Sequence, residues 1–232
     1  MSKKKLQRFS EIKTFSNVFE PRLEELKTGN HPLKGKWNST YFKNNNPIVL
    51  ELGCGKGEYS IGMAEKYPGK NFIGVDIKGA RIWNGAKKAT MGKINNVAFL
   101  RTRIEFIDSF FANGEVAEIW ITFPDPQPQK PREKKRLTSL KFLKIYQNFL
   151  SAKGMIYLKT DNAGLLEYSL EVIEENHFEL IFCSRDIYGD TEYSIPKEAT
   201  SIQTYYEFGF LKQGLKICFL IFSLNRKKRF KT

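Results

Sequence analysis

The chain has few of the residues that build disulfide frameworks and metal centres. Its 232 residues include three cysteines, Cys54, Cys183 and Cys218, which cannot all pair and form no C-x-x-C motif. The two histidines lie far apart in the sequence, which argues against a dedicated zinc site. We therefore expect reduced thiols, no bound metal and a cytoplasmic location, where thiols stay reduced.

Long apolar runs are absent as well. The longest, Ile217 to Phe222, is far too short to cross a bilayer, and the basic N-terminus lacks the apolar core of a signal peptide. Hydrophobic residues still make up 41% of the chain and aromatic residues 14%, so we expect a globular, ordered protein. The length suits one large domain at 47–232, preceded by a basic tail and lead-in segment at 1–46.

Acidic residues are outnumbered by basic ones. The chain has 25 Asp and Glu against 38 Lys and Arg, a formal net charge of +13. Such an excess favours a polyanionic partner, most often a nucleic acid, although a merely basic enzyme is the alternative. The basic residues near the two ends, in 1–20 and 226–229, are expected to lie in solvated tails, the first of them mobile. An accessory phosphate contact by the first tail is the alternative.

From Pro47 onward, segments of strand and helix type alternate. Strands are expected at 48–52, 71–76, 97–101, 118–123, 154–159, 178–184 and 215–222. Helices are expected at 58–67, 79–94, 104–112, 137–151 and 163–176. This order predicts an α/β, Rossmann-like fold: a seven-stranded, mostly parallel sheet with helices on both faces. Since no helix is expected between the last two strands, the final strand should run antiparallel.

A glycine turn follows the first of these strands. Glu51 ends an apolar run, and Gly53, Gly55 and Gly57 follow before the first helix. A turn of this kind brings backbone N–H groups close to a ligand. The spacing differs from the G-x-G-x-x-G of dinucleotide folds, and Glu51 would repel phosphates but favour a cation such as an ammonium or sulfonium. A glycine turn in some other α/β protein is the alternative.

Further acidic residues follow other strands, at the sheet edge where ligands bind in such folds. Asp76 ends the second strand and can accept hydrogen bonds from a ribose diol, or it can cap the next helix. Asp125 lies between Pro124 and Pro126, whose fixed φ angles would hold the carboxylate rigidly for a planar heterocycle with N–H donors. A proline-rich loop that only ends a strand is the alternative.

Three more segments invite a functional interpretation. Five of the seven residues in 130–136 are basic, which predicts either a phosphate-contacting loop or a solvated face. Asp161 can cap the helix at 163–176 or reach a substrate. The segment Thr204 to Glu207 can hydrogen-bond and stack a base, or it can begin a strand.

Together, these motifs carry a resemblance. The segments 51–57, 123–126, 130–137, 159–162 and 204–207 occur in this order, and over roughly residue 45 to the C-terminus the chain resembles the bacterial tRNA (guanine-N7-)-methyltransferases. These belong to the class I S-adenosylmethionine-dependent methyltransferases. The resemblance implies methyl transfer from S-adenosyl-L-methionine to N7 of a guanine in the tRNA variable loop, at position 46. It leaves open whether the protein is a monomer or a homodimer.

The resemblance also implies roles by position. Asp125 would be the catalytic residue. The cofactor would contact Glu51, Gly53, Gly55, Gly57, Asp76, Arg103 and Asp125. The substrate would contact Gln129, Lys130, Asp161, Thr204, Tyr205, Tyr206 and Glu207.

Three positions depart from the family pattern. Arg103 stands where an acidic residue usually faces the cofactor adenine, with Glu105 close by as a substitute. Gln127 replaces an aromatic residue and Gln129 a lysine, with Lys130 next to it. These departures keep two alternatives open: a methyltransferase of another RNA, and a non-catalytic RNA-binding module with a degenerate site.

Overall fold

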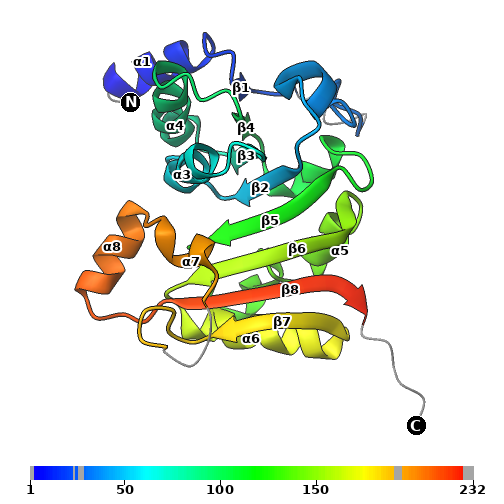
Figure 1. Cartoon of the computed structure of the whole chain (residues 1–232), viewed down its shortest axis with the longest axis vertical. Helices are drawn as coiled ribbons and strands as arrows, with labels where there is room; N and C mark the ends of the chain where they lie inside the picture. The colour runs from blue at the N-terminus through cyan, green and yellow to red at the C-terminus, as the bar shows by residue number, and fades with distance from the viewer. Residues whose placement is uncertain (1–2, 23, 26–28, 191–194, 227–232) are drawn as a thin grey trace.

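The computed structural model describes residues 3–22, 24–25, 29–190 and 195–226. One sheet runs through it in the order β1-β4-β3-β2-β5-β6-β8-β7 (Figure 1). The strands are β1 (Val18–Phe19), β2 (Ile48–Leu52), β3 (Asn71–Asp76), β4 (Val97–Arg101), β5 (Val116–Thr122), β6 (Leu150–Thr160), β7 (Phe178–Ser184) and β8 (Cys218–Arg226). The pairs from β1 to β6 are parallel, whereas β8 lies between β6 and β7 and is antiparallel to both.

Helices cover both faces of this sheet. The α-helices are α1 (Lys3–Ile12), α3 (Glu58–Lys66), α4 (Gly79–Met91), α5 (Leu140–Tyr146), α6 (Ala163–Glu175), α7 (Lys197–Ser201) and α8 (Tyr205–Lys212). The described residues also include a π-helix, η1 (Trp37–Phe42), and two 3-10 helices, η2 (Ile104–Ser109) and η3 (Lys130–Lys135). Figure 1 shows α7 and α8 at the edge of the sheet where the parallel strands end. No helix in these described ranges is long and apolar enough to span a membrane.

The two faces of β2 explain how the site residue Glu51 is placed. Successive side chains of a strand point to opposite faces. Ile48, Leu50 and Leu52 belong to the apolar cluster that includes residues of α5 and α6. Val49 belongs to the cluster under α3 and α4. Glu51 therefore lies on the α3 and α4 face, and its carboxylate accepts hydrogen bonds from α3.

The predicted fold class is confirmed, and several details differ. All seven expected strands form, and the two-residue β1 adds an eighth at the edge. The expected helix at 137–151 is confined to α5, because Leu150 pairs with Val116 and begins β6 instead. The segment 104–112 forms the shorter η2 rather than an α-helix.

The connection between β7 and β8 contains two helices, α7 and α8, where none was expected. The last strand is antiparallel as predicted, but the absence of a helix is not the reason. Its direction follows from its place in the sheet: β8 inserts between β6 and β7, and hydrogen-bonds to both in antiparallel register.

The N-terminal segment was expected to be a mobile tail, and residues 3–12 instead form α1 against α4. Ile12 is buried. Glu11 accepts hydrogen bonds from Trp83 Nε1 at 2.9 Å and from Lys87 Nζ at 3.0 Å. The Arg8 guanidinium lies 4.6 Å from the centre of the Trp83 ring. Amphipathic packing thus orders a segment whose composition alone indicated solvation. The basic residues at 227–229 lie outside the described residues.

Candidate active site

A pocket of about 420 Å³ opens where β2, β3, β4 and β5 end. This volume is typical of a small-molecule site. It is lined by Gly53, Asp76, Ile77, Lys78, Arg81, Thr102, Arg103, Ile104, Glu105, Phe123, Pro124, Asp125, Gln127, Lys135, Leu137 and Phe142. A smaller pocket of about 70 Å³ shares Gly53, Arg81 and Phe123 with it and reaches Glu51. The structure therefore brings Asp76, Arg103 and Asp125 into one pocket and places Glu51 in an adjoining one.

The glycine turn between β2 and α3 requires glycine for steric reasons. Gly53, Gly55 and Gly57 all have positive φ, between 55° and 79°. A Cβ on Gly57 would lie 2.5 Å from the Phe99 ring. The turn is held by hydrogen bonds from the N–H groups of Gly53 and Cys54 to the Val75 carbonyl, at 2.8 and 3.0 Å. Gly53 lines both pockets and Gly55 lines the smaller one, whereas Gly57 lines neither of them.

Asp76, at the end of β3, braces the glycine turn from the neighbouring strand. Its Oδ2 accepts from the Gly55 N–H at 3.0 Å, and its Oδ1 accepts from the Lys78 N–H at 2.7 Å. Lys78, not Asp76, is the N-cap residue of α4, and its side chain makes no capping bond. The helix-cap interpretation of Asp76 is therefore wrong. Its carboxylate lines the larger pocket.

Glu51 is almost completely buried, with 5% of its surface exposed. It accepts hydrogen bonds from the Ser60 N–H at 2.9 Å, from the Ser60 hydroxyl, and from the Thr122 hydroxyl at 2.7 Å. Burial raises the pKa of the Glu51 carboxyl to about 7, although the hydrogen bonds from Ser60 and Thr122 oppose the shift. This group is therefore poised to change its charge near neutral pH.

The turn after β5 carries Asp125 on a strained backbone. Phe123 and Gln127 have φ of 47° and 44°, a left-handed conformation that is rare for residues other than glycine. Asp125 is exposed, and its Oδ1 accepts from the Gln127 N–H at 3.1 Å. Arg136 donates from Nε to the carbonyl of Pro126 at 3.1 Å and from Nη2 to that of Gln127 at 3.2 Å. The hydrogen bonds of Asp125 and Arg136 to this turn hold its strained backbone in place.

The basic segment 130–136 divides into two parts. Residues 130–135 form η3, which has no buried residue, and Lys135 alone among them reaches the pocket wall. Gln129 and Lys130 are exposed and line neither of the two pockets. Arg136 is instead committed to the Asp125 turn, and its guanidinium lies 4.2 Å from the centre of the Tyr168 ring. It is a structural clamp that the charge pattern did not distinguish from its neighbours.

The wall of the larger pocket near the end of β4 includes Arg103 and Glu105. Arg103 and Glu105 form an ion pair, with 3.3 Å between Nη2 and Oε1. Thr102 is 6% exposed, and its hydroxyl has no hydrogen-bond partner among the residues that the structure describes. A buried hydroxyl that lacks a partner is costly unless a ligand or water satisfies it. Thr102 was not identified from the sequence, because a single threonine after a strand carries no signal.

Two sequence motifs far apart in the chain meet beside the smaller pocket. Lys159, near the end of β6, forms an ion pair with Glu207 in the first turn of α8. Thr204 and Glu207 also form a reciprocal capping box, so the segment begins a helix and the strand interpretation is wrong. Thr204 and Tyr206 line the smaller pocket. Lys159, which the site prediction omitted, holds this arrangement together.

Asp161 and Tyr205 lie outside both pockets. The helix α6 is capped by Asn162, whose Oδ1 accepts from the Leu165 N–H at 2.8 Å, so the capping role considered for Asp161 is wrong. Asp161 is partly exposed. Tyr205 lines a separate cleft with Lys56.

The sheet order with an antiparallel β8 between β6 and β7, and the pocket beside the glycine turn, define a class I methyltransferase fold. The solved 16S rRNA methyltransferase KamB aligns with a TM-score of 0.57 at 15% identity, over 86% of this chain and 90% of that one. The 16S rRNA (adenine(1408)-N(1))-methyltransferase from Catenulisporales acidiphilia, solved with cosubstrate SAM, aligns with a TM-score of 0.56 at 12% identity, over 92% and 96%.

Sequence comparison resolves the family within that class. Residues 45–220 match a family model described as "Putative methyltransferase". The tRNA (guanine-N(7)-)-methyltransferase of Christiangramia forsetii is 51% identical, over 97% of this chain and 99% of its own. That of Bacteroides fragilis is 46% identical, over 98% and 88%. The chain belongs to the tRNA (guanine-N(7)-)-methyltransferase family.

Proposed function

We propose that this protein transfers a methyl group from S-adenosyl-L-methionine to N7 of a guanine in tRNA, at position 46 of the variable loop. One observation carries the proposal: Asp76, Asp125 and the glycine turn share a single pocket in a chain with a net charge of +13. Carboxylates there suit a cationic methyl donor, and the surrounding positive charge suits a polyanion. The family membership of the chain supports both halves of this assignment.

The residues of the two pockets fit S-adenosyl-L-methionine. The unpartnered Thr102 hydroxyl lies in the pocket wall with Arg103 and Glu105, the part we assign to the adenine. Asp76 would hold the ribose diol, as carboxylates do in related nucleotide sites. We assign the amino-acid end to the smaller pocket, where Glu51 offers a carboxylate to an ammonium. Gly53, Gly55 and Gly57 would let the backbone approach the ligand closely.

The cofactor supplies an electrophilic methyl group on a positively charged sulfur. Guanine N7 already carries an in-plane lone pair, so the transfer needs no general base. The task of the chain is to hold the base in line at attack distance. Asp125, exposed at the mouth of the pocket and fixed by the Gln127 N–H, would accept hydrogen bonds from the guanine N–H edge. Its charge would also stabilise the positive charge that develops on the base.

The rest of the tRNA would be held by residues outside the larger pocket. We assign Gln129, Lys130, Asp161 and the segment Thr204 to Glu207 to substrate binding. The exposed positions of Gln129, Lys130 and Tyr205 support contact with a large partner. The fully buried Glu207 would act through its placement of α8 rather than by direct contact. We place the reaction in the cytoplasm, by either a monomer or a homodimer.

The test is transfer of labelled methyl from S-adenosyl-L-methionine to tRNA, followed by nucleoside analysis. We expect 7-methylguanosine at position 46. The Asp125→Asn variant should lose on the order of 100-fold in kcat, the scale of one electrostatic stabiliser, with unchanged tRNA affinity. Near-normal turnover of this variant would remove Asp125 from the chemistry. Methylation of rRNA but not tRNA, or no binding of S-adenosyl-L-methionine by calorimetry, would contradict the proposed function itself.

A further inference from the structure

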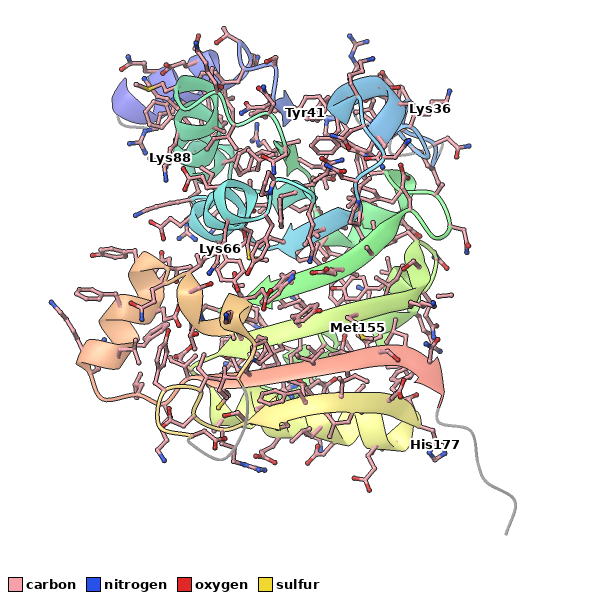
Figure 2. All side chains as sticks on the ribbon, viewed as in Figure 1. Lys36, Tyr41, Lys66, Lys88, Met155 and His177 are labelled. Atoms are coloured by element: carbon pink, nitrogen blue, oxygen red, sulfur yellow. The ribbon has the colours of Figure 1, made fainter. Side chains whose placement is uncertain are left out.

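A cleft of about 560 Å³ lies at the edge of the sheet where the parallel strands begin. Two of its lining residues, Asn17 and Asn95, stand just before β1 and β4. The methyl-transfer pockets open at the opposite edge, and the cleft shares no lining residue with them. Figure 2 shows Tyr41, another lining residue, beside η1 and on the side of the molecule away from α7 and α8. We call this space the amino-edge cleft. Its volume is typical of a small-molecule site.

One polar atom of the amino-edge cleft is buried without a partner. Asn17 is 6% exposed, and its Nδ2 donates to the Ala86 carbonyl at 3.1 Å. Its Oδ1 accepts no hydrogen bond from a described residue. In the described part of the chain two buried side-chain atoms are in this state, and the other is the Thr102 hydroxyl in the wall of the larger pocket. Such an atom is costly unless a ligand or water satisfies it, so Asn17 favours a ligand with a hydrogen-bond donor.

Two lysines bring positive charge to the amino-edge cleft. Lys43 and Lys93 are exposed, and neither forms an ion pair with a described residue. Lys43 Nζ donates to the Ser39 carbonyl at 3.1 Å, which leaves other protons free. Among the described residues that line the cleft, none is acidic. Two ammonium groups without a counter-ion favour an anionic ligand.

The backbone at both lysines is unusual. Lys43 ends η1 and Lys93 follows the end of α4, with φ of 56° and 53°. Glycine or asparagine is the usual residue in this left-handed conformation at the end of a helix. The chain therefore has a lysine at two positions of one cleft where glycine would fit with less strain.

Aromatic rings supply the apolar part of the wall. Phe42 is 7% exposed, and the hydroxyl of the partly buried Tyr41 donates to the Val97 carbonyl at 3.1 Å. Burial raises the pKa of Tyr41 to about 12, so this hydroxyl stays neutral and keeps its hydrogen bond. The cleft thus combines aromatic surface, an acceptor for an N–H group and two cations. A nucleotide has the complementary groups: a planar base with an amine, and a phosphate.

We propose that the amino-edge cleft binds a nucleoside monophosphate whose base carries an exocyclic amine. The base lies against Tyr41 and Phe42 and donates its amine to Asn17 Oδ1, while the phosphate contacts Lys43 and Lys93. This ligand is distinct from the groups assigned to the methyl-transfer pockets, and the inference does not depend on that assignment. Its source is either a free mononucleotide or one nucleotide of a bound tRNA, which present the same chemistry.

The test is calorimetric titration of the full chain with mononucleotides. S-adenosyl-L-homocysteine is present at saturation, so that the pocket assigned to adenosine is filled. Adenosine and guanosine monophosphates are compared with inosine monophosphate, which lacks both amines, and cytidine monophosphate with uridine monophosphate. We expect the amine-bearing nucleotide of at least one comparison to bind about tenfold more tightly than its amine-free partner, the scale of one hydrogen bond to a group otherwise unsatisfied. Inorganic phosphate should bind more weakly than that nucleotide.

Replacement of both Lys43 and Lys93 by Asn removes the charges with a residue that tolerates the left-handed backbone. This double variant should bind the preferred nucleotide about tenfold more weakly, the scale of a lost charge-assisted contact, with unchanged affinity for S-adenosyl-L-homocysteine. The matched control is Lys36→Asn, because Lys36 precedes η1 and is exposed but does not line the amino-edge cleft. It should bind the nucleotide as the wild type does.

Binding of tRNA distinguishes the two sources. If the nucleotide belongs to tRNA, the double variant should bind tRNA more weakly, and its slope of log K against log salt should be flatter by about 0.7 to 0.9, the value for one phosphate contact. If the ligand is a free mononucleotide, tRNA should bind the double variant and the wild type equally.

Equal affinity for amine-bearing and amine-free nucleotides in every comparison would overturn the inference, as would unchanged nucleotide binding in the double variant. Inorganic phosphate that binds as tightly as the best nucleotide would reduce the cleft to an anion-binding patch. Failure of the proposed function is a separate result, since S-adenosyl-L-homocysteine binding and 7-methylguanosine formation are measured on the wild type. A wild-type protein that forms this product and binds no mononucleotide would contradict the inference alone.

Discussion

The ammonium of Lys159 and the carboxylate of Glu207 lie 2.6 Å apart, and neither side chain is exposed. Lys159 also donates to the Ile202 carbonyl at 3.3 Å, and the Tyr188 hydroxyl donates to Glu207 at 2.8 Å. Burial lowers the pKa of Lys159 from its ordinary value, while the nearby Glu207 opposes the shift. This ion pair fixes α8 against the end of β6, and with it the wall that Thr204 and Tyr206 give to the small pocket.

Removal of one partner of this pair should be strongly destabilising. Lys159→Met leaves the Glu207 carboxylate buried without its counter-ion, so we expect a loss of about 3 to 5 kcal/mol in the free energy of unfolding. The double variant Lys159→Met, Glu207→Met should recover most of that loss, because no charge remains buried. Urea unfolding followed by circular dichroism measures both.

The exposed pair Arg185–Glu167, with 2.8 Å between Nη2 and Oε1, is the control for this measurement. Arg185→Gln should change stability little, since solvent screens an exposed pair. A Lys159→Met variant no less stable than Arg185→Gln would show that the buried pair does not hold α8 in place.

Arg136 should support methyl transfer by holding the Asp125 turn in place, not by binding a phosphate of the tRNA. Arg136→Lys loses the forked hydrogen bonds to Pro126 and Gln127. We expect kcat to fall on the order of tenfold, with the salt slope of tRNA binding unchanged. Replacement of both Lys130 and Lys134 by Ala should leave kcat unchanged and flatten the salt slope, because both side chains are exposed. A flattened salt slope in Arg136→Lys would return this residue to the phosphate-contacting group.

Relief of backbone strain at Gln127 should stabilise the protein and impair its activity. Gln127→Gly removes the steric cost of a φ of 44°, worth about 1 kcal/mol, but loosens the turn that holds Asp125. His177→Gly is the matched control, because His177 has a φ of 57° after α6 and lies outside the pockets. It should gain similar stability with unchanged methyl transfer. Thermal unfolding and initial rates test both, and full activity in Gln127→Gly would contradict the strain argument.

Glu51 should give the folding stability a pH dependence. Its folded-state pKa of about 7 lies above the ordinary value of 4.5, so the folded protein binds this proton more tightly. The resulting stabilisation is complete below pH 4.5 and is lost as the pH rises to about 7, a change of about 3 kcal/mol. Glu51→Gln lacks the titration, so its stability relative to wild type should rise over this window. If urea unfolding gave the same change in the free energy of unfolding with pH for both proteins, Glu51 would not be the group that titrates.

The same carboxyl should make cofactor affinity depend on pH. Loss of the Glu51 proton creates a negative charge beside the small pocket, which favours the ammonium of S-adenosyl-L-methionine. Calorimetry should therefore show tighter binding at pH 7 than at pH 5.5 for the wild type, a range in which the α-ammonium of the cofactor stays protonated. Glu51→Gln should show weaker binding with a flatter profile. An unchanged profile in the variant would place the amino-acid end of the cofactor away from Glu51.

The strands that match their predicted bounds are those with purely local signals. The strands β2, β3, β4 and β7 begin and end as expected, because each is a short apolar or β-branched run bounded by turn residues. The helix α8 escaped prediction, since its first turn depends on the Thr204–Glu207 capping box and on Lys159. The helix α1 escaped because its order depends on contacts with α4.

The candidate site shows the same division. The sequence indicated Asp76 and Asp125, because a carboxylate after a parallel strand must lie at the ligand-binding edge. It did not separate Arg136 from its basic neighbours, nor Tyr205 from Tyr206. Adjacent residues of one type look alike in a sequence, and only their partners in space distinguish them.

The amino-acid sequence by itself determined the glycine turn and the alternation of strands and helices. Both depend on short-range sterics and on the spacing of apolar residues, which neighbouring residues specify. The tertiary structure alone decided that Lys159 is buried against Glu207, that Arg136 clamps the Asp125 turn, and that two adjacent tyrosines serve different clefts. Lys159 and Glu207 are far apart in the chain, and the contacts of Arg136 and of the two tyrosines depend on how their loop and helix pack, so these interactions form only once the tertiary structure is in place.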